Sequence, residues 1–136
     1  MKRHLAVLLI ASCAASLSTA SSCLHYGGEP ITLSGKVTLQ TFFGPPNYGE
    51  NPDTDSRETQ GILVLVRPVC VSANPVSYDM AETNQVKVTL VPPDGVNLKN
   101  FAGKRVTVQG TLFHAITGHH HTPVLMQVSR IEKSRE

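Results

Sequence analysis

The amino-acid sequence predicts an all-β domain, a small barrel of five strands with one short helix. Three observations support this prediction: five segments alternate apolar and polar residues, only one segment has helical spacing, and glycines interrupt two strands. The 136 residues suffice for one ordinary domain and are too few for a two-domain enzyme. Hydrophobic residues make up 40% of the chain and charged residues 16%, which excludes a disordered tail and a multi-span membrane protein.

The five strand segments are recognised by their periodicity. Residues 62–66 are apolar at every position, as expected for a strand covered on both faces, and the other segments alternate as half-buried strands do. The segments are 31–40, 62–66 with a continuation at 69–71 beyond Pro68, 86–90, 106–112 and 124–129. Residues 96–102 place Leu98 and Phe101 three apart and stop at Gly103, which predicts the short helix.

Three strands, a helix and two further strands follow one another in the order of the OB-fold, a small Greek-key barrel. Gly35 and Gly110 lie inside predicted strands, where glycines often mark the bends that a barrel requires. Another small barrel or a sandwich is the alternative, because the order of strands does not determine their pairing. We therefore expect an OB-fold-like five-stranded barrel with the helix between its third and fourth strands.

Residues 1–20 have the features of a bacterial-type secretory signal peptide. Lys2 and Arg3 precede a short apolar run, and Ser18 and Ala20 occupy the small-residue positions of a cleavage site. We therefore expect a single mature domain at 21–136, either periplasmic or secreted, and no transmembrane span, because the apolar run is too short to cross a bilayer. Without Lys2 and Arg3, ten basic residues remain against ten acidic ones. This neutral balance argues against a nucleic-acid partner.

Two features of the cysteines follow from export. Residues 10–13 look like a lipobox, so an alternative is a lipoprotein that is anchored to the membrane through Cys13. Both routes lead to an oxidising compartment, in which Cys23 and Cys70 are expected to form a disulfide. That bond would tie the mature N-terminus to the middle of the domain.

Two unusual loops mark the expected binding face. Residues 44–60 form a long segment rich in Pro, Asn, Asp and Gly, and residues 114–122 form a turn with three consecutive histidines. In an OB-fold, the loop after the first strand and the loop before the fifth flank the same face. We therefore expect these loops to be neighbours. The carboxylates of Asp53, Asp55 and Glu58 could chelate Ca²⁺, but with Pro52 and Ser56 among them we expect a solvated loop. The candidate ligand-binding residues are Tyr48, His114, His119, His120, His121 and Thr122.

Three of these histidines raise the question of a metal. Because neighbouring residues of an extended segment point to opposite sides, His114, His119 and His121 could share one side while His120 faces away. Three neutral imidazoles would suit zinc or another divalent transition metal. The alternative is a turn whose imidazoles hydrogen-bond to backbone groups. Clustered imidazoles should also hold at least one histidine pKa below about 6.5.

Catalytic signatures are weak. The sequence lacks a G-x-S-x-G elbow, a glycine-rich phosphate loop and the H-E-x-x-H motif. We therefore name no catalytic residue, expect no cofactor, and favour a non-enzymatic module that binds an envelope protein or a cell-wall glycan. The alternative is a histidine-dependent metal-binding protein or a metal-dependent hydrolase.

Four motifs carry a resemblance to a known family: Gly-Glu-Pro at 28–30, Phe-Gly-Pro-Pro-Asn-Tyr at 43–48, Pro-x-Cys-Val at 68–71 and GKRVTVQGTLFHAITGHHHTPVL at 103–125. With these motifs the chain resembles an uncharacterised secreted bacterial family, the domain of unknown function 4431. The resemblance implies an exported bacterial domain and no particular mechanism. At Ile116 the family pattern has another histidine, so a metal that used that position would be held less well here.

Overall fold

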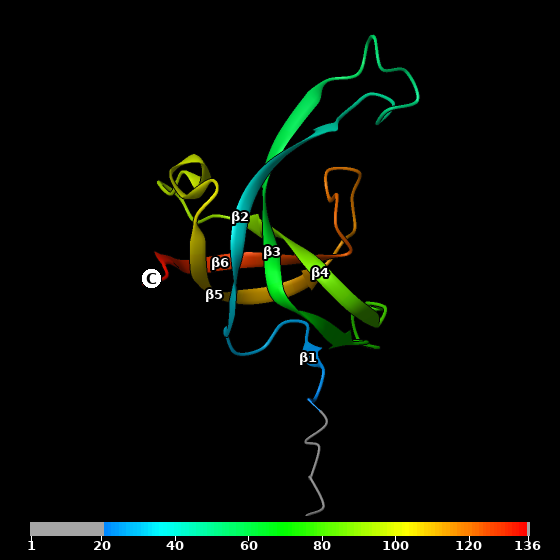
Figure 1. Ribbon diagram of the computed structural model, residues 1–136. Helices are drawn as coiled ribbons and strands as arrows, with labels where there is room; N and C mark the ends of the chain where they lie inside the picture. The colour runs from blue at the N-terminus through cyan, green and yellow to red at the C-terminus, as the bar shows by residue number, and fades with distance from the viewer. Residues whose placement is uncertain (1–20, 136) are drawn as a thin grey trace, which may run out of the picture.

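The computed structural model describes residues 21–135, which form a barrel of strands (Figure 1). The predicted signal peptide and Cys13 lie outside the described residues. The elements in chain order are β1 (Leu24–His25), β2 (Ile31–Phe43), β3 (Arg57–Ser72), β4 (Glu82–Val91), the 3-10 helix η1 (Leu98–Phe101), β5 (Arg105–His114) and β6 (Val124–Lys133).

Strand pairing confirms the all-β, OB-like barrel. β2 lies between β3 and β5 and is antiparallel to both. β3 also pairs with β4, and β5 pairs with β6, both in antiparallel orientation. The parallel pair of β4 and β6 closes the ring. The five predicted strands thus correspond to β2 to β6, and η1 lies between β4 and β5, as the order of segments predicted.

Three details differ from the prediction. β1 is an additional strand of two residues, parallel to β3, and is too short to produce a periodic pattern. β3 runs through Pro68 as one strand, although its register to β4 shifts between Val64 and Val69, around the residue that lacks an N–H. The helix is a single 3-10 turn, which begins where the side chain of Asn97 accepts a hydrogen bond from the backbone N–H of Lys99.

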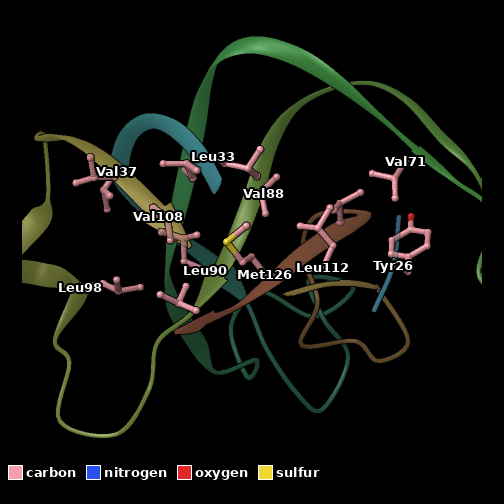
Figure 2. Packing of buried hydrophobic residues seen from close by; sticks show 14 residues of the cluster. Tyr26, Leu33, Val37, Val71, Val88, Leu90, Leu98, Val108, Leu112 and Met126 are labelled. Atoms are coloured by element: carbon pink, nitrogen blue, oxygen red, sulfur yellow. The ribbon is translucent and has the colours of Figure 1, made fainter. Parts of the chain in front are cut away.

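The core consists mainly of inward-facing valines and leucines from the strands (Figure 2). Figure 2 shows Leu98 of η1 at one end of this cluster and Tyr26, which follows β1, at the other. Leu98 fits closely over Gly61 of β3, where a Cβ atom would lie 2.4 Å from the Cδ1 atom of Leu98. The short helix therefore closes one end of the barrel, and it needs a glycine beneath it to do so.

The two glycines that were expected to mark bends both lie where the backbone of a neighbouring strand comes close. Gly110 lies where the β5–β6 register shifts, and a Cβ atom there would be 2.2 Å from the carbonyl oxygen of Gln127. Gly35 of β2 pairs with β3 on one side and with β5 on the other. A Cβ atom there would be 2.3 Å from the carbonyl oxygen of Val64. Close backbone approach at both positions excludes a side chain.

Cys23 and Cys70 form a disulfide with a Cα–Cα distance of 4.7 Å, which confirms the predicted pair. The bond lies next to the pairing of β1 with β3, so the described N-terminus is fixed to the far end of β3. Among residues 21–135, no helix has the length and apolar character needed to cross a membrane.

Candidate functional site

The loop at residues 44–56 is built around a buried carboxylate. β3 begins at Arg57, so the loop ends at residue 56 and not at residue 60 as predicted. The guanidinium of Arg57 lies 3.8 Å above the ring of Phe43, at the other end of the loop. The Asp55 carboxylate accepts hydrogen bonds from the backbone N–H groups of Asn47 (2.8 Å), Gly49 (2.7 Å) and Asn51 (3.2 Å).

Burial alone would raise the pKa of the Asp55 carboxyl, but the backbone N–H groups lower it below its ordinary value. Only 8% of Asp55 is exposed, so the interpretation of this residue as solvated was wrong. The ionised carboxylate gives the loop a defined shape.

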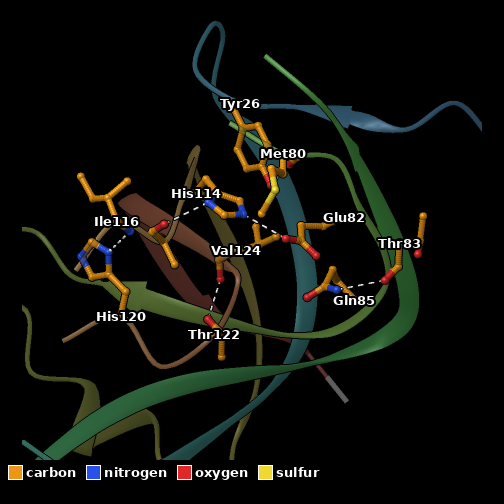
Figure 3. A network of polar contacts seen from close by, with 11 residues as sticks. Tyr26, Met80, Glu82, Thr83, Gln85, His114, Ile116, His120, Thr122 and Val124 are labelled. Atoms are coloured by element: carbon orange, nitrogen blue, oxygen red, sulfur yellow. Dashed lines mark hydrogen bonds and ion pairs between the residues drawn. The ribbon is translucent and has the colours of Figure 1, made fainter. Parts of the chain in front are cut away.

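The turn at residues 115–123, called the histidine hairpin below, is fastened to the barrel by Thr122. Its hydroxyl accepts a hydrogen bond from the backbone N–H of Thr89 (3.1 Å), bonds to the Thr89 hydroxyl (2.7 Å) and donates to the carbonyl of Val124 (2.7 Å). Figure 3 shows the bond to Val124. Thr122 is buried and has its partners within the protein, so it positions the hairpin and offers little to a ligand.

Two histidines of the hairpin converge on Glu58 of β3, a group called the Glu58 clasp below. The Oε1 atom of Glu58 accepts a hydrogen bond from Nδ1 of His119, and Oε2 accepts one from Nε2 of His121 at 3.0 Å. The exposed fraction of the side chain is 19% for Glu58, 13% for His121 and 54% for His119. The bond from His121 lowers the pKa of Glu58; burial opposes this, and the bond from His119 adds to it.

Aromatic contacts join the 44–56 loop to this clasp. The Phe42 ring stacks on His121 with ring centroids 4.2 Å apart, and the Tyr48 ring meets His119 edge-on at 5.7 Å. Tyr48 also packs over Gly118, where a Cβ atom would lie 2.7 Å from the tyrosine ring. The structure thus brings together the two loops that were expected to be neighbours. Figure 1 shows the histidine hairpin rising beside the long β2–β3 pair that ends in the 44–56 loop.

His114 does not join this group (Figure 3). Its Nδ1 atom lies 3.0 Å from the carbonyl oxygen of Ala115, and its Nε2 atom lies 2.9 Å from a carboxylate oxygen of Glu82. Both ring nitrogens are thus directed to hydrogen-bond acceptors of the protein, and neither is directed to His119 or His121. The expected zinc set of His114, His119 and His121 is therefore not assembled. Within residues 21–135, no three His, Cys, Asp or Glu side chains are arranged to hold a metal ion.

His120 does not join the clasp. Its Nδ1 atom accepts a hydrogen bond of 3.0 Å from the backbone N–H of Ile116 (Figure 3). Its ring packs edge-on against Phe113. Burial, followed by the charges of His119 and His121, lowers the pKa of His120. The neutral ring therefore carries its proton on Nε2.

A pocket of about 650 Å³ opens between the histidine hairpin and residues 92–99. Its apolar wall comes from the strands and from η1, and its polar groups include Gln60, Asn97, His119 and His120. Gln60 donates a hydrogen bond of 2.7 Å from Nε2 to the carbonyl oxygen of His119. Its Oε1 atom is buried and has no hydrogen-bond partner among the described residues.

Glu58 and Gln60 are site residues that the sequence analysis did not identify. Both were assigned to a long loop, whereas the structure places them in β3 opposite Phe42 and Gln40 of β2. The available signal was the pair Phe42–Phe43, since two aromatic residues favour a longer β2, and its antiparallel partner must lengthen equally.

Comparison with known proteins gives one match. The model of the family described as "Domain of unknown function (DUF4431)" matches residues 85–132, which include most of β4, η1, β5, the histidine hairpin and nearly all of β6. No curated protein and no solved structure matches the chain. This match supports the resemblance to the family of domain of unknown function 4431 over the part of the barrel that carries the histidine hairpin.

Proposed function

We propose that the chain is an exported binding module of the bacterial cell envelope and that its partner is a segment of another envelope protein. One observation supports this most strongly: the Glu58 clasp and Tyr48 join two loops into a single surface beside an apolar pocket. In OB-like barrels, these two loops flank the face that binds ligands.

The hydrogen bonds of the histidines hold the hairpin in one shape. Nδ1 of His119 and Nε2 of His121 are directed to Glu58, and Nδ1 of His120 holds the backbone of Ile116. A surface that is fixed before its partner arrives loses less conformational freedom on binding, which supports a role in recognition.

Exposed apolar side chains favour a protein partner over a glycan. Ile116 of the hairpin is 78% exposed, Tyr48 is 42% exposed, and Leu39 beside the pocket is 38% exposed. Interfaces between proteins are centred on such apolar and aromatic side chains, which lose contact with water when the partner binds.

Photo-crosslinking in the producing cell tests the proposal. A photoreactive phenylalanine is placed at Tyr48 or, as a matched control, at Tyr78, which is a 90% exposed tyrosine of the 73–81 loop. We expect an adduct of one defined protein mass from position 48 and none from position 78. Equal adducts at both positions, or none at position 48, would contradict the proposed face. If the chain instead sediments with purified insoluble cell wall, the partner is a glycan and not a protein.

The alternative of a metal-binding protein is tested by elemental analysis of the chain purified without a tag. The proposal expects far less than one zinc or other transition metal per chain. A content near one per chain, lost in a Glu58→Gln variant, would move the protein to the metal-dependent class.

A further inference from the structure

The pocket beside the histidine hairpin has the size and lining of a site for a small molecule. Its volume of about 650 Å³ lies within the range of known ligand sites, which are mostly apolar with a few directed polar groups. Leu39, Leu90, Val96 and Leu98 supply apolar surface.

Gln60 indicates which polar group a ligand should carry. Its amide nitrogen is already bonded to the carbonyl of His119, while its Oε1 atom is buried without a partner among residues 21–135. A buried acceptor without a donor is unfavourable, and a ligand that donates to it removes that cost. The last torsion of a glutamine side chain is soft, so a ligand in the pocket would reach this oxygen by a rotation of the amide, which also moves the nitrogen that is bonded to His119.

The charges around the pocket favour an uncharged ligand. His120 is in its neutral form at pH 7, because burial and the neighbouring imidazoles lower its pKa. His119 is paired with the Glu58 carboxylate, and Lys99 is exposed at the rim. An ionised group placed deep in the pocket would lose water without gaining an opposite charge.

We propose that this pocket binds an uncharged amphiphile: an apolar molecule that carries one hydroxyl or amide N–H donor, which bonds to Oε1 of Gln60. The inference deepens the proposed function, because the pocket adjoins the same hairpin and forms the recessed part of the same face. The donor satisfies the buried oxygen, and the apolar body covers Val96 and Leu98.

Two neutral probes, which differ by one O-methyl group, test the proposal on the intact chain. 2-Naphthol has the donor, whereas 2-methoxynaphthalene has the same ring system without it. In NMR titrations we expect 2-naphthol to shift the amide signals of Gly61 and Val96 and to bind about tenfold more tightly, as one hydrogen bond to a buried acceptor would give. The anion 2-naphthoate should bind more weakly than 2-naphthol. Equal affinity for the two neutral probes, or shifts that map elsewhere, would overturn the proposal.

Matched variants locate the effect. Val96→Trp fills the pocket and should weaken both neutral probes at least tenfold, whereas Val86→Trp on the exposed outside of β4 should leave both unchanged. Gln60→Met keeps the length of the side chain but removes the oxygen, so the preference for 2-naphthol should disappear. If neither neutral probe binds while the crosslink from position 48 persists, the pocket inference fails alone. If both are lost, the proposed function fails as well.

Discussion

The two ends of strand β3 are held by different kinds of interaction. At its C-terminal end, Cys70 is bonded to Cys23, and β1 pairs with Val71 and Ser72. Tyr26 packs there as well, and burial, followed by the charges of Glu82 and Asp79, raises its pKa to about 12. At the N-terminal end, the histidine hairpin is held by hydrogen bonds of Glu58 and Gln60 and by aromatic contacts, with no covalent bond.

This difference shows which end can serve recognition. A covalent bond and a packed core resist local opening, whereas polar contacts between partly exposed loops open at low cost. The apolar pocket and the two joined loops lie at the N-terminal end of β3, where Glu58 and Gln60 make these polar contacts. Carboxylate–histidine pairs occur at both ends, but His114 and Glu82 join the ends of two strands, whereas Glu58 joins a strand to a loop.

The largest expected effect concerns the C-terminal end of β3, which the disulfide holds. Replacing Cys23 and Cys70 together by serine opens a bond that spans 47 residues, so the free energy of unfolding should fall by about 4 kcal/mol. Urea unfolding followed by circular dichroism measures the change. A fall of less than about 1 kcal/mol would mean that the core and β1 hold this end without the bond.

A smaller effect is expected at the polar end. Glu58→Gln removes the charge from the acceptor of two imidazoles, and we expect the free energy of unfolding to fall by about 2 kcal/mol, the value of hydrogen bonds to a charged group. Glu132→Gln is the control, because that carboxylate pairs with Arg130 while 56% of its side chain is exposed, and it should change stability by less than about 0.5 kcal/mol. Equal effects of the two substitutions would mean that the clasp contributes no more than a surface ion pair.

The two histidines of the clasp should contribute unequally. His121 is nearly buried and stacks on Phe42, so His121→Gln should cost about 1 kcal/mol, whereas His119→Gln should cost about half as much or less because His119 is half exposed. Parallel urea titrations of both variants measure the order. A greater loss for His119 would show that its contact with Tyr48 outweighs burial.

The smallest effect is a dependence on pH. The pKa of His120 is lower in the folded protein than in the unfolded chain, where it is about 6.5. Between the folded pKa and about pH 6.5, the unfolded chain therefore binds a proton that the folded chain does not. Stability from this group is therefore complete above about pH 6.5 and is lost as the pH falls through the folded pKa. We expect His120→Gln to flatten the stability profile between about pH 7 and pH 5. An unchanged profile would assign the dependence to other groups.

The same reasoning applies to Glu58 in a more acidic range. Its lowered pKa adds stability above about pH 4.3, and that stability is lost as the pH falls through the folded pKa.

Much of the fold follows from local patterns. The period of two places β2, β4, β5 and β6, because the side chains of a strand alternate between its two faces. After export only Cys23 and Cys70 remain in the expected mature chain, so one pairing is available. Gly110 lies where the register between β5 and β6 shifts, and the close approach of the Gln127 carbonyl there leaves no room for a side chain.

The composition of the site was decided by tertiary structure. Glu58 lies 63 residues from His121, and the carboxylate of Glu82 reaches His114 across 32 residues. Local periodicity has no information on which side chains meet across strands so far apart in sequence. The pairing of β3 with β2 and β4 brings Glu58 to the histidine hairpin and Glu82 to His114. As a result, His119 and His121 bond to Glu58, His114 bonds to Glu82, and His120 bonds to the backbone of Ile116.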